Sequence, residues 1–309
     1  MEIKQLRYFA VTAKHSSLVK AAAALGIGQP ALGRQIAQLE RELGVRLLFR
    51  NGKGIRLSPE GTRFLESISQ PLSELLEAQT EISSAAGKPA GNISVAIPPF
   101  VADVIGENLV RKFMTRCPNV GLHVRDGYGG EIQDWLVSGM FDVALTHARR
   151  TPSMRLDPVF KSEIVLSATQ KLLRDFGIDK KDVSMEQAMQ FPLILPWRHT
   201  TFRRQIEEVA ASHHLKPINV VAEVDSLITL RRLVEGGVAG TIVPYGSIRN
   251  LPGIKQLRVV DPAWFSEYMI AYSPHAPLTL GLREFVRVLR SEIAAGLQRG
   301  SFKGSMLES

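Results

Sequence analysis

The sequence predicts a mainly helical N-terminal domain with a winged helix-turn-helix, then one long helix, then a larger α/β domain. Three observations predict this order. Residues 17–43 have the pattern of two helices separated by glycines, residues 59–84 keep one helical pattern, and strands alternate with helices from residue 92 onward. With 309 residues and 45% hydrophobic side chains, the chain is long enough for two or three domains.

The first two helices are predicted from apolar spacing and from their end signals. The first spans residues 3–14. Ser16 or Ser17 is expected to cap the second, since a serine oxygen accepts a hydrogen bond from a free amide at a helix start. Gly26 suits the end of the second helix, because glycine adopts the left-handed backbone that closes a helix. The inward apolar faces are predicted to carry Leu6, Phe9, Ala10 and Ala13, then Leu18, Ala21, Ala22 and Leu25.

A third helix is predicted from Gln29-Pro30, because proline in the first turn loses no needed hydrogen bond. Leu32, Ile36 and Leu39 recur at helical spacing and form its predicted buried face. Glutamine and arginine on the other faces can hydrogen-bond to base edges, and alanine can contact a thymine methyl group. This layout favours a helix-turn-helix, with an ordinary helical hairpin inside a core as the alternative. The candidates for base contact are Gln29, Pro30, Ala31, Gly33, Arg34 and Gln38.

A basic β-hairpin is predicted directly after the third helix. Two short apolar runs, residues 47–49 and 55–57, flank a turn with an Asn-Gly pair, which is a strong hairpin signal. Arg50 and Lys53 at its tip are expected to contact phosphates or a minor groove. Residues 1–58 carry ten Lys and Arg against three Glu, an excess that is typical of proteins that bind the phosphate backbone.

A long acidic helix is predicted after the hairpin. Residues 58–60 supply a serine cap, a first-turn proline and a glutamate near the positive helix end. The pattern continues to about residue 84 with an apolar seam, so residues 59–86 are interpreted as a dimerising linker helix. The alternative is a helix packed on its own domain. Pro71 is expected to kink or interrupt the helix, and residues 87–91 are expected to form a hinge.

Short motifs occur in a fixed order over residues 3–65, among them Leu6-Arg7-Tyr8-Phe9, Gln29-Pro30-Ala31-Leu32 and Leu57-Ser58-Pro59-Glu60-Gly61. In this order they resemble the N-terminal domain of the LysR-type transcriptional regulators. The family's recognition helix usually has serine where this chain has glycine. Gly28 can still cap the helix. Gly33 is expected to cost about 0.5–1 kcal/mol relative to alanine, and it removes a hydroxyl contact.

The α/β part is predicted to have strands at residues 93–97, 121–126, 143–146, 164–168, 193–195, 219–224 and 241–243, and helices at 102–117, 226–235 and 281–297. It resembles the LysR effector-binding region, a two-lobed fold similar to periplasmic binding proteins. The resemblance implies an effector-binding domain over residues 92–302, with lobe I at 92–161 and 269–302 and lobe II at 162–268. Several segments look most like the branch that contains nitrogen-assimilation control regulators.

Ligands of open α/β folds bind beyond the carboxyl ends of the strands, and the resemblance points to this cleft for a small-molecule effector. Amides at a helix start near Phe100 are expected to hold an anion, and Arg198 is expected to pair with a carboxylate. Phe100 stands where the family often has serine or threonine, which favours an apolar or aromatic effector. The candidate effector-binding residues are Pro99, Phe100, Val101, Gly129, Thr146, Arg198, Thr200, Thr201, Pro244 and Tyr245.

The sequence contains no recognisable enzyme or metal-binding pattern. Its seven histidines lack metal-ligand spacing, and it has neither a glycine-rich phosphate loop nor a Gly-x-Ser-x-Gly elbow. The single cysteine excludes an intrachain disulfide. No apolar run approaches the roughly 20 residues of a membrane span, and the N-terminal residues do not predict a signal peptide. We therefore expect a cytoplasmic protein without a cofactor or a metal ion.

Taken together, the patterns and the resemblance predict a transcriptional regulator that binds double-stranded promoter DNA as a homodimer or homotetramer. An effector in the cleft is expected to favour one arrangement of the oligomer and so to set the spacing of paired winged heads. One alternative is a regulator that needs no effector, with its cleft filled by Phe100 and neighbouring side chains. The other is a small-molecule binding protein or enzyme, in which the basic residues 1–58 have no evident role.

Overall fold

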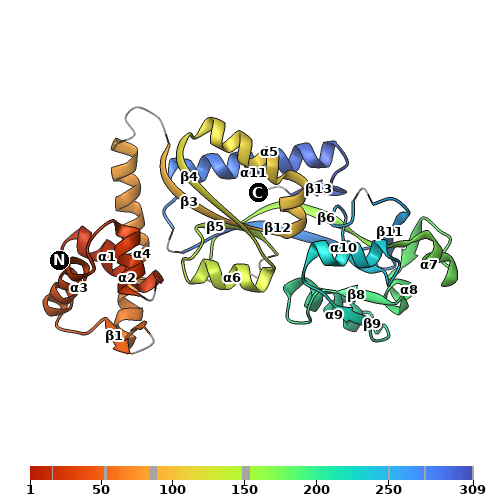
Figure 1. Ribbon diagram of the computed structural model, residues 1–309, viewed down its shortest axis with the longest axis horizontal. Helices are drawn as coiled ribbons and strands as arrows, with labels where there is room; N and C mark the ends of the chain where they lie inside the picture. Colours follow the sequence, from red (N-terminus) through yellow and green to blue (C-terminus); the bar gives the residue numbers. More distant parts are fainter. Residues whose placement is uncertain are drawn as a thin grey trace.

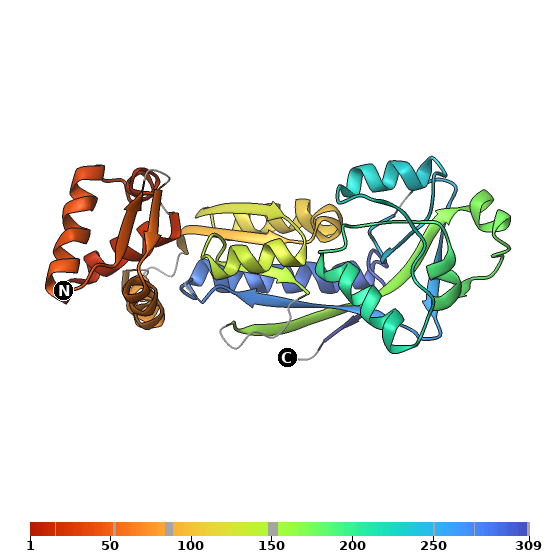
Figure 2. The same ribbon diagram turned by 90° about the horizontal axis from the view of Figure 1, so that it is seen from below.

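The computed structural model describes residues 1–15, 17–51, 54–83, 89–147, 154–249, 251–274 and 276–307. It shows a helical head, a long helix beside it and an elongated α/β body made of two lobes (Figure 1). The head lies at one end of the molecule and the second lobe at the other, with the first lobe between them (Figure 2). This confirms the predicted fold class.

The head is built from α1 (Ile3–His15), α2 (Leu18–Leu25), α3 (Gln29–Leu43) and a hairpin of β1 (Leu48–Asn51) and β2 (Gly54–Leu57). Its helices share one core, in which Phe9, Leu32 and Leu39 are fully buried. Ser17 caps α2 by accepting a hydrogen bond from the Lys20 amide. Gly26 ends α2 with a φ of 64°, as predicted.

The hairpin is fixed to α3 by a carboxylate. Glu40 accepts hydrogen bonds from the backbone amides of Leu47 and Leu48, at 2.8 and 3.0 Å. Ser58, at the other end of the hairpin, donates to the Arg46 carbonyl and accepts from the Gly61 amide. Both sets of bonds hold the wing in one position relative to α3, and those to Glu40 are the stronger, because a charge-assisted bond to a backbone amide is stronger than a neutral one.

The long helix α4 (Pro59–Ser83) packs on the head through its first half. Phe64, Leu65 and Ile68 contact the head core. The helix continues through Pro71, so of the two expected effects, a kink or an interruption, the interruption is wrong. The contacts of the first half fit the alternative of a helix packed on its own domain, and the dimerising role of the helix stays a prediction.

The body contains a nine-stranded sheet in which β6 is the shared strand. From one edge the order is β4, β3, β5, β12, β6, β11, β7, and both β10 and β13 also pair with β6. The first half of β6 pairs with β12, and its second half pairs with β10 and β11. The predicted strand at 164–168 is only the second half of β6. The bounds are β3 (Ala90–Ile97), β4 (Asn119–Asp126), β5 (Val143–Thr146), β6 (Leu156–Thr169), β7 (Asp182–Ser184), β10 (Thr241–Pro244), β11 (Ile254–Val260), β12 (Phe265–Tyr272) and β13 (Gly304–Met306).

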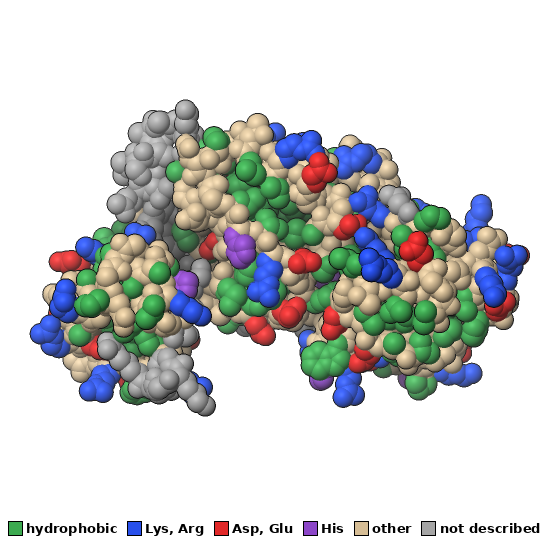
Figure 3. All heavy atoms as spheres, in the orientation of Figure 1, with side chains coloured by type: hydrophobic (Ala, Val, Ile, Leu, Met, Phe, Trp, Pro, Cys, Tyr) green, Lys and Arg blue, Asp and Glu red, His purple; other side chains and the backbone are tan. Residues whose placement is uncertain are grey.

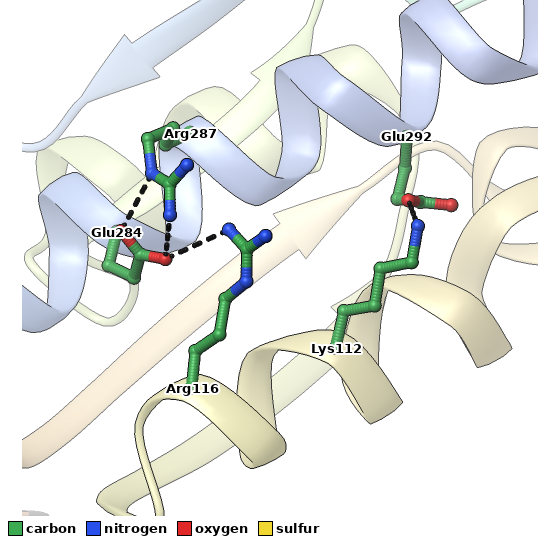
Figure 4. Close-up of polar contacts among 5 residues, drawn as sticks. All are labelled: Lys112, Arg116, Glu284, Arg287 and Glu292. Atoms are coloured by element: carbon green, nitrogen blue, oxygen red, sulfur yellow. Dashed lines mark hydrogen bonds and ion pairs between the residues drawn. The ribbon is translucent and has the colours of Figure 1, made fainter.

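The first lobe is covered on one face by two long helices, α5 (Pro99–Arg116) and α11 (Leu280–Gln298), and on the other by α6 (Gly129–Val137) (Figure 1). Phe113 and Phe285 meet edge to face between α5 and α11. Ion pairs also join these helices: Lys112 binds the fully buried Glu292, and Arg116 and Arg287 share Glu284 (Figure 4).

The second lobe has its own core, around Leu166, Phe191 and Ile206. Its other elements are α7 (Gln170–Asp175), α8 (Met185–Gln190), β8 (Leu193–Leu195), α9 (Thr201–Ser212), β9 (Val220–Glu223) and α10 (Leu227–Glu235). None of the described helices, in either lobe or in the head, has the length and apolar character needed to cross a membrane.

Candidate functional site

The outer face of α3 is polar and open to solvent. Gln29, Pro30 and Arg34 are exposed, and Ala31 and Gly33 are partly exposed. Leu32, Ile36 and Leu39 lie on the opposite face, in the head core. The other predicted contact residue of this helix is Gln38, which is exposed and donates a hydrogen bond to Glu42 at 3.1 Å.

Basic side chains lie around the surface of the head (Figure 3). Arg46, Arg56 and Lys20 are exposed there. Lys53 and the side chain of Arg50 fall outside the described residues, so their predicted contacts stay predictions. The head therefore offers a polar helix face together with positive charge, which suits the major groove and its flanking phosphates.

Two adjacent cavities lie between the lobes of the body. The outer one, of about 890 Å³, is bounded in the first lobe by the start of α5, the loop after β4 and α6, and in the second lobe by the loop after β8 and the start of α10. The inner one, of about 50 Å³, is mainly apolar. They share Pro99, Gly127, Tyr128 and Leu227 as lining residues.

The two lobes are joined by polar contacts beside these cavities. Asp103 on α5 pairs with Arg231 on α10 at 2.7 Å and with Arg249 at 3.4 Å. The hydrogen bond from Arg231 holds the pKa of the Asp103 carboxyl below its usual value, despite partial burial. The Tyr128 hydroxyl donates to the Asp225 carbonyl across the cleft. We call these two groups the interlobe contacts.

The lobes also approach closely at Gly129. A Cβ atom at this position would lie 2.8 Å from Oγ1 of Thr201, which belongs to the second lobe. Only glycine leaves room for the threonine there, because ordinary Cβ contacts are longer.

Six of the ten predicted effector-binding residues line a cavity, and four do not. Pro99 and Thr200 line the outer cavity, and Phe100, Gly129, Thr146 and Pro244 line the inner one. Val101 is fully buried in the core of the first lobe. The remaining three lie outside both described cavities: Arg198 is exposed, Thr201 packs against Gly129, and Tyr245 lies under the Lys303 ammonium group.

The start of α5 has fewer free amides than the sequence suggested for an anion site. Pro99 has no N–H group, and the amides of Val101 and Ala102 both donate to the Pro98 carbonyl at 3.0 Å. The Phe100 ring packs against Tyr268 and Phe302. Phe100 therefore packs in the core and also lines the inner cavity, while the outer cavity stays open beside it.

The sequence interpretation missed the carboxylates of the outer cavity. Asp126 is the last residue of a predicted strand, and Asp225 follows another, so the strand-end rule could have found both. Asp103, Glu131 and Asp134 lie on helices and carried no such signal.

His147 is a packing residue at the inner cavity. Its Nδ1 atom lies 3.1 Å from the Glu267 carbonyl oxygen and 3.0 Å from Oγ of Ser266, and its ring packs on Tyr268. Burial lowers the pKa of His147 to about 4, so the imidazole is neutral at pH 7. Among the described residues, no group of three His, Cys, Asp or Glu side chains could hold a metal ion.

Two family models match the chain over almost its whole length. The model described as "LysR substrate binding domain" matches residues 86–294, and the one described as "Bacterial regulatory helix-turn-helix protein, lysR family" matches residues 3–62. The chain belongs to the LysR family. It is a transcriptional regulator with a DNA-binding domain and an effector-binding domain, and the families and relatives that it matches are regulators rather than enzymes.

Individual LysR relatives agree with this assignment. The nitrogen assimilation regulatory protein nac of Klebsiella aerogenes is 25% identical over 82% of this chain and 81% of its own length. The transcriptional regulator BsdA of Bacillus subtilis is 30% identical over 79% of this chain and 84% of its own length.

Solved structures show the same fold. A full-length OxyR variant from Pseudomonas aeruginosa superposes with a TM-score of 0.75 at 21% identity, covering 95% of this chain and 94% of that one. Full-length CbnR in complex with its target DNA superposes with a TM-score of 0.54 at 24% identity, covering 94% of this chain and all of CbnR.

Proposed function

We propose that α3 enters the major groove of an operator and that Gln29, Pro30, Ala31, Gly33, Arg34 and Gln38 face its bases. The observation that carries this proposal is the solvent-exposed polar face of α3, opposite a fully apolar buried face. Arg50 and Lys53 are proposed to contact the DNA backbone or minor groove from the wing. Because transcriptional regulation takes place on DNA, the cytoplasm is the proposed location.

The cleft is the proposed effector site. It is supported by the outer cavity of about 890 Å³, which is within the size range of small-molecule sites, and by its place at the carboxyl ends of the strands. The residues proposed to contact an effector are those that line the two cavities: Pro99, Phe100, Gly129, Thr146, Thr200 and Pro244.

Control of DNA binding is proposed to act through the oligomer. The second half of α4, beyond the contact with the head, is the proposed dimer element, within a homodimer or homotetramer. An effector that binds one arrangement of the lobes better than the other shifts the population toward that arrangement. The working domain limits are residues 1–58, 59–86, 87–91 and 92–302.

A gel-shift titration with duplex DNA from the region upstream of the protein's own gene tests the DNA interface. Arg34→Ala is expected to weaken binding by about 1–3 kcal/mol, because it removes a contact to a base. Arg204→Ala, an exposed arginine on α9 in the second lobe, is the matched control and is expected to bind like the wild type. An unchanged curve for Arg34→Ala contradicts the proposed role of this residue.

A further inference from the structure

The charged side chains that line the outer cavity are mostly acidic. Its lining residues, all within the described part of the chain, carry five carboxylates and a single guanidinium, that of Arg231. Arg231 is already bound to Asp103, which also receives Arg249. None of the other carboxylates forms an ion pair with a Lys or Arg among the described residues. They are Asp126, Glu131, Asp134 and Asp225.

These four carboxylates approach one space from both lobes. Asp126, Glu131 and Asp134 belong to the first lobe, and Asp225 reaches in from the second. Acidic side chains are visible beside the hollow between the lobes in Figure 3. Burial, together with the charges of Asp225, Asp126 and Glu131, raises the pKa of Tyr128 to about 12. The potential in this part of the cleft is therefore negative.

Aromatic side chains accompany the carboxylates. Tyr128 lies between the outer and inner cavities, and Trp197 lines the outer one with half of its surface exposed. The face of an aromatic ring attracts a cation, and this attraction adds to that of neighbouring carboxylates. The combination of carboxylates and rings is typical of sites that bind organic cations.

The inner cavity gives a second, independent sign of a ligand. Thr146 lines it and is 2% exposed, and its hydroxyl has no hydrogen-bond partner among the described residues. A buried hydroxyl without a partner is unfavourable, so such groups normally bind a ligand atom or a water molecule. The other walls of this cavity are mainly apolar, formed by residues such as Phe202, Leu230 and Val243.

We propose that the effector is an organic amine. Its ammonium group binds among Asp126, Glu131, Asp134 and Asp225 in the outer cavity, and its uncharged end lies toward Thr146 in the inner cavity. This inference rests on the proposed function of the cleft and names the chemical class of its ligand. An aromatic amine agrees with the apolar or aromatic effector expected from the sequence, and it does not need the anion contacts expected from Arg198, which lies outside both cavities.

Three probes of similar size and different charge test the proposal. The full-length protein is titrated calorimetrically with 2-phenylethylamine, 2-phenylethanol and 3-phenylpropanoate, and its melting temperature is measured with each. The amine is expected to bind about tenfold or more tightly than the alcohol and to raise the melting temperature, while the acid gives no shift. Tyramine and cadaverine extend the amine series.

Two variants locate the charge recognition. The double variant Asp126→Asn with Asp134→Asn is expected to weaken amine binding about tenfold or more, at nearly unchanged volume. Glu107→Gln is the matched control, since Glu107 is an exposed carboxylate on α5 outside the cavities, and it is expected to bind amines like the wild type. Equal amine affinity in the double variant and in the wild type overturns the assignment of these carboxylates.

The possible outcomes separate this inference from the function on which it rests. Binding of the acid without binding of any amine overturns the amine proposal and leaves the cleft as an effector site. Absence of binding by amines, and also by a panel of acids, sugars and nucleosides, overturns the proposed effector site itself.

Discussion

The DNA-binding head and the ligand cleft differ in how the chain builds them. The head core comes from one continuous stretch, and the helix that faces solvent carries its own buried face. The cleft is assembled from loops and helix starts of both lobes, spread over residues 99–231, which are held together by the interlobe contacts. A local sequence pattern therefore predicts which side chains of α3 face solvent, whereas the chemistry of the cleft depends on which distant segments meet.

The largest expected effect is a loss of stability in the head alone. A Cβ atom on Gly61 would lie 2.0 Å from the Leu47 carbonyl oxygen, so Gly61→Ala must displace backbone where α4 meets the hairpin. We expect the free energy of unfolding of the head to fall by about 3 kcal/mol. Hydrogen exchange is expected to quicken in the head and to stay unchanged in the body.

Gly106→Ala on α5 is the matched control for that substitution. Its Cβ atom would meet nothing within 4 Å, and alanine favours a helix over glycine by about 0.5–1 kcal/mol. We expect equal or slightly higher stability. Equal effects of the two alanines would show that crowding at Gly61 is not decisive.

The second prediction concerns pH and acts on the body alone. The pKa of His147 is lowered to about 4 in the folded protein, so the unfolded chain binds the extra proton between about pH 6.5 and 4. Stability from this group is therefore full above pH 6.5 and falls as the pH is lowered, by about 2 kcal/mol at pH 5. Denaturant unfolding at pH 8 and pH 5 measures this change in the free energy of unfolding. If His147→Phe loses the same amount of stability over this range, the titration does not belong to His147.

The third prediction compares two neighbouring cations on α5. Lys112→Met leaves the fully buried carboxylate of Glu292 without its ion pair and is expected to destabilise the body by about 1–3 kcal/mol. Arg111→Met breaks an exposed pair with Glu107, which is worth at most about 0.5 kcal/mol. Thermal unfolding of both variants makes the comparison. Equal losses would contradict the importance of burial at Glu292.

The smallest expected effect concerns the interlobe contacts. Asp103→Asn weakens the pairs with Arg231 and Arg249, which are partly exposed, so we expect a loss of about 0.5–1 kcal/mol. Hydrogen exchange in α10 is expected to quicken, because this helix loses a bond to the first lobe. Asp182→Asn breaks an exposed pair with Arg258 within the second lobe, and it is expected to leave α10 unchanged. Equal protection of α10 in all three proteins would contradict a fastening role for Asp103.

The sequence predicted the head well because its signals are local. The spacing of Leu32, Ile36 and Leu39 defines both faces of α3, and Gly26 marks the end of α2. The interruption expected at Pro71 did not follow, because α4 remains one helix through that residue.

Prediction of the cleft was partial for a physical reason. The strand-end rule located its walls but could not tell which side chains face inward. Thr200 lines the outer cavity, while Arg198, two residues earlier, is exposed outside it. Similarly, Asp225 meets Tyr128 only when the lobes come together. Such pairings depend on tertiary structure, so local patterns do not reveal them.

The central claim is that the head binds DNA and the cleft binds an effector that controls this binding. Linkage requires that an effector that changes operator affinity by some factor has its own affinity changed by the operator by the same factor. The direct measurement is titration of the full-length protein with operator duplex, with and without saturating 2-phenylethylamine, and the reverse titration with and without the duplex. We expect the two factors to be equal and to differ from one. A factor of one in both directions for every ligand that binds the cleft would contradict the central claim.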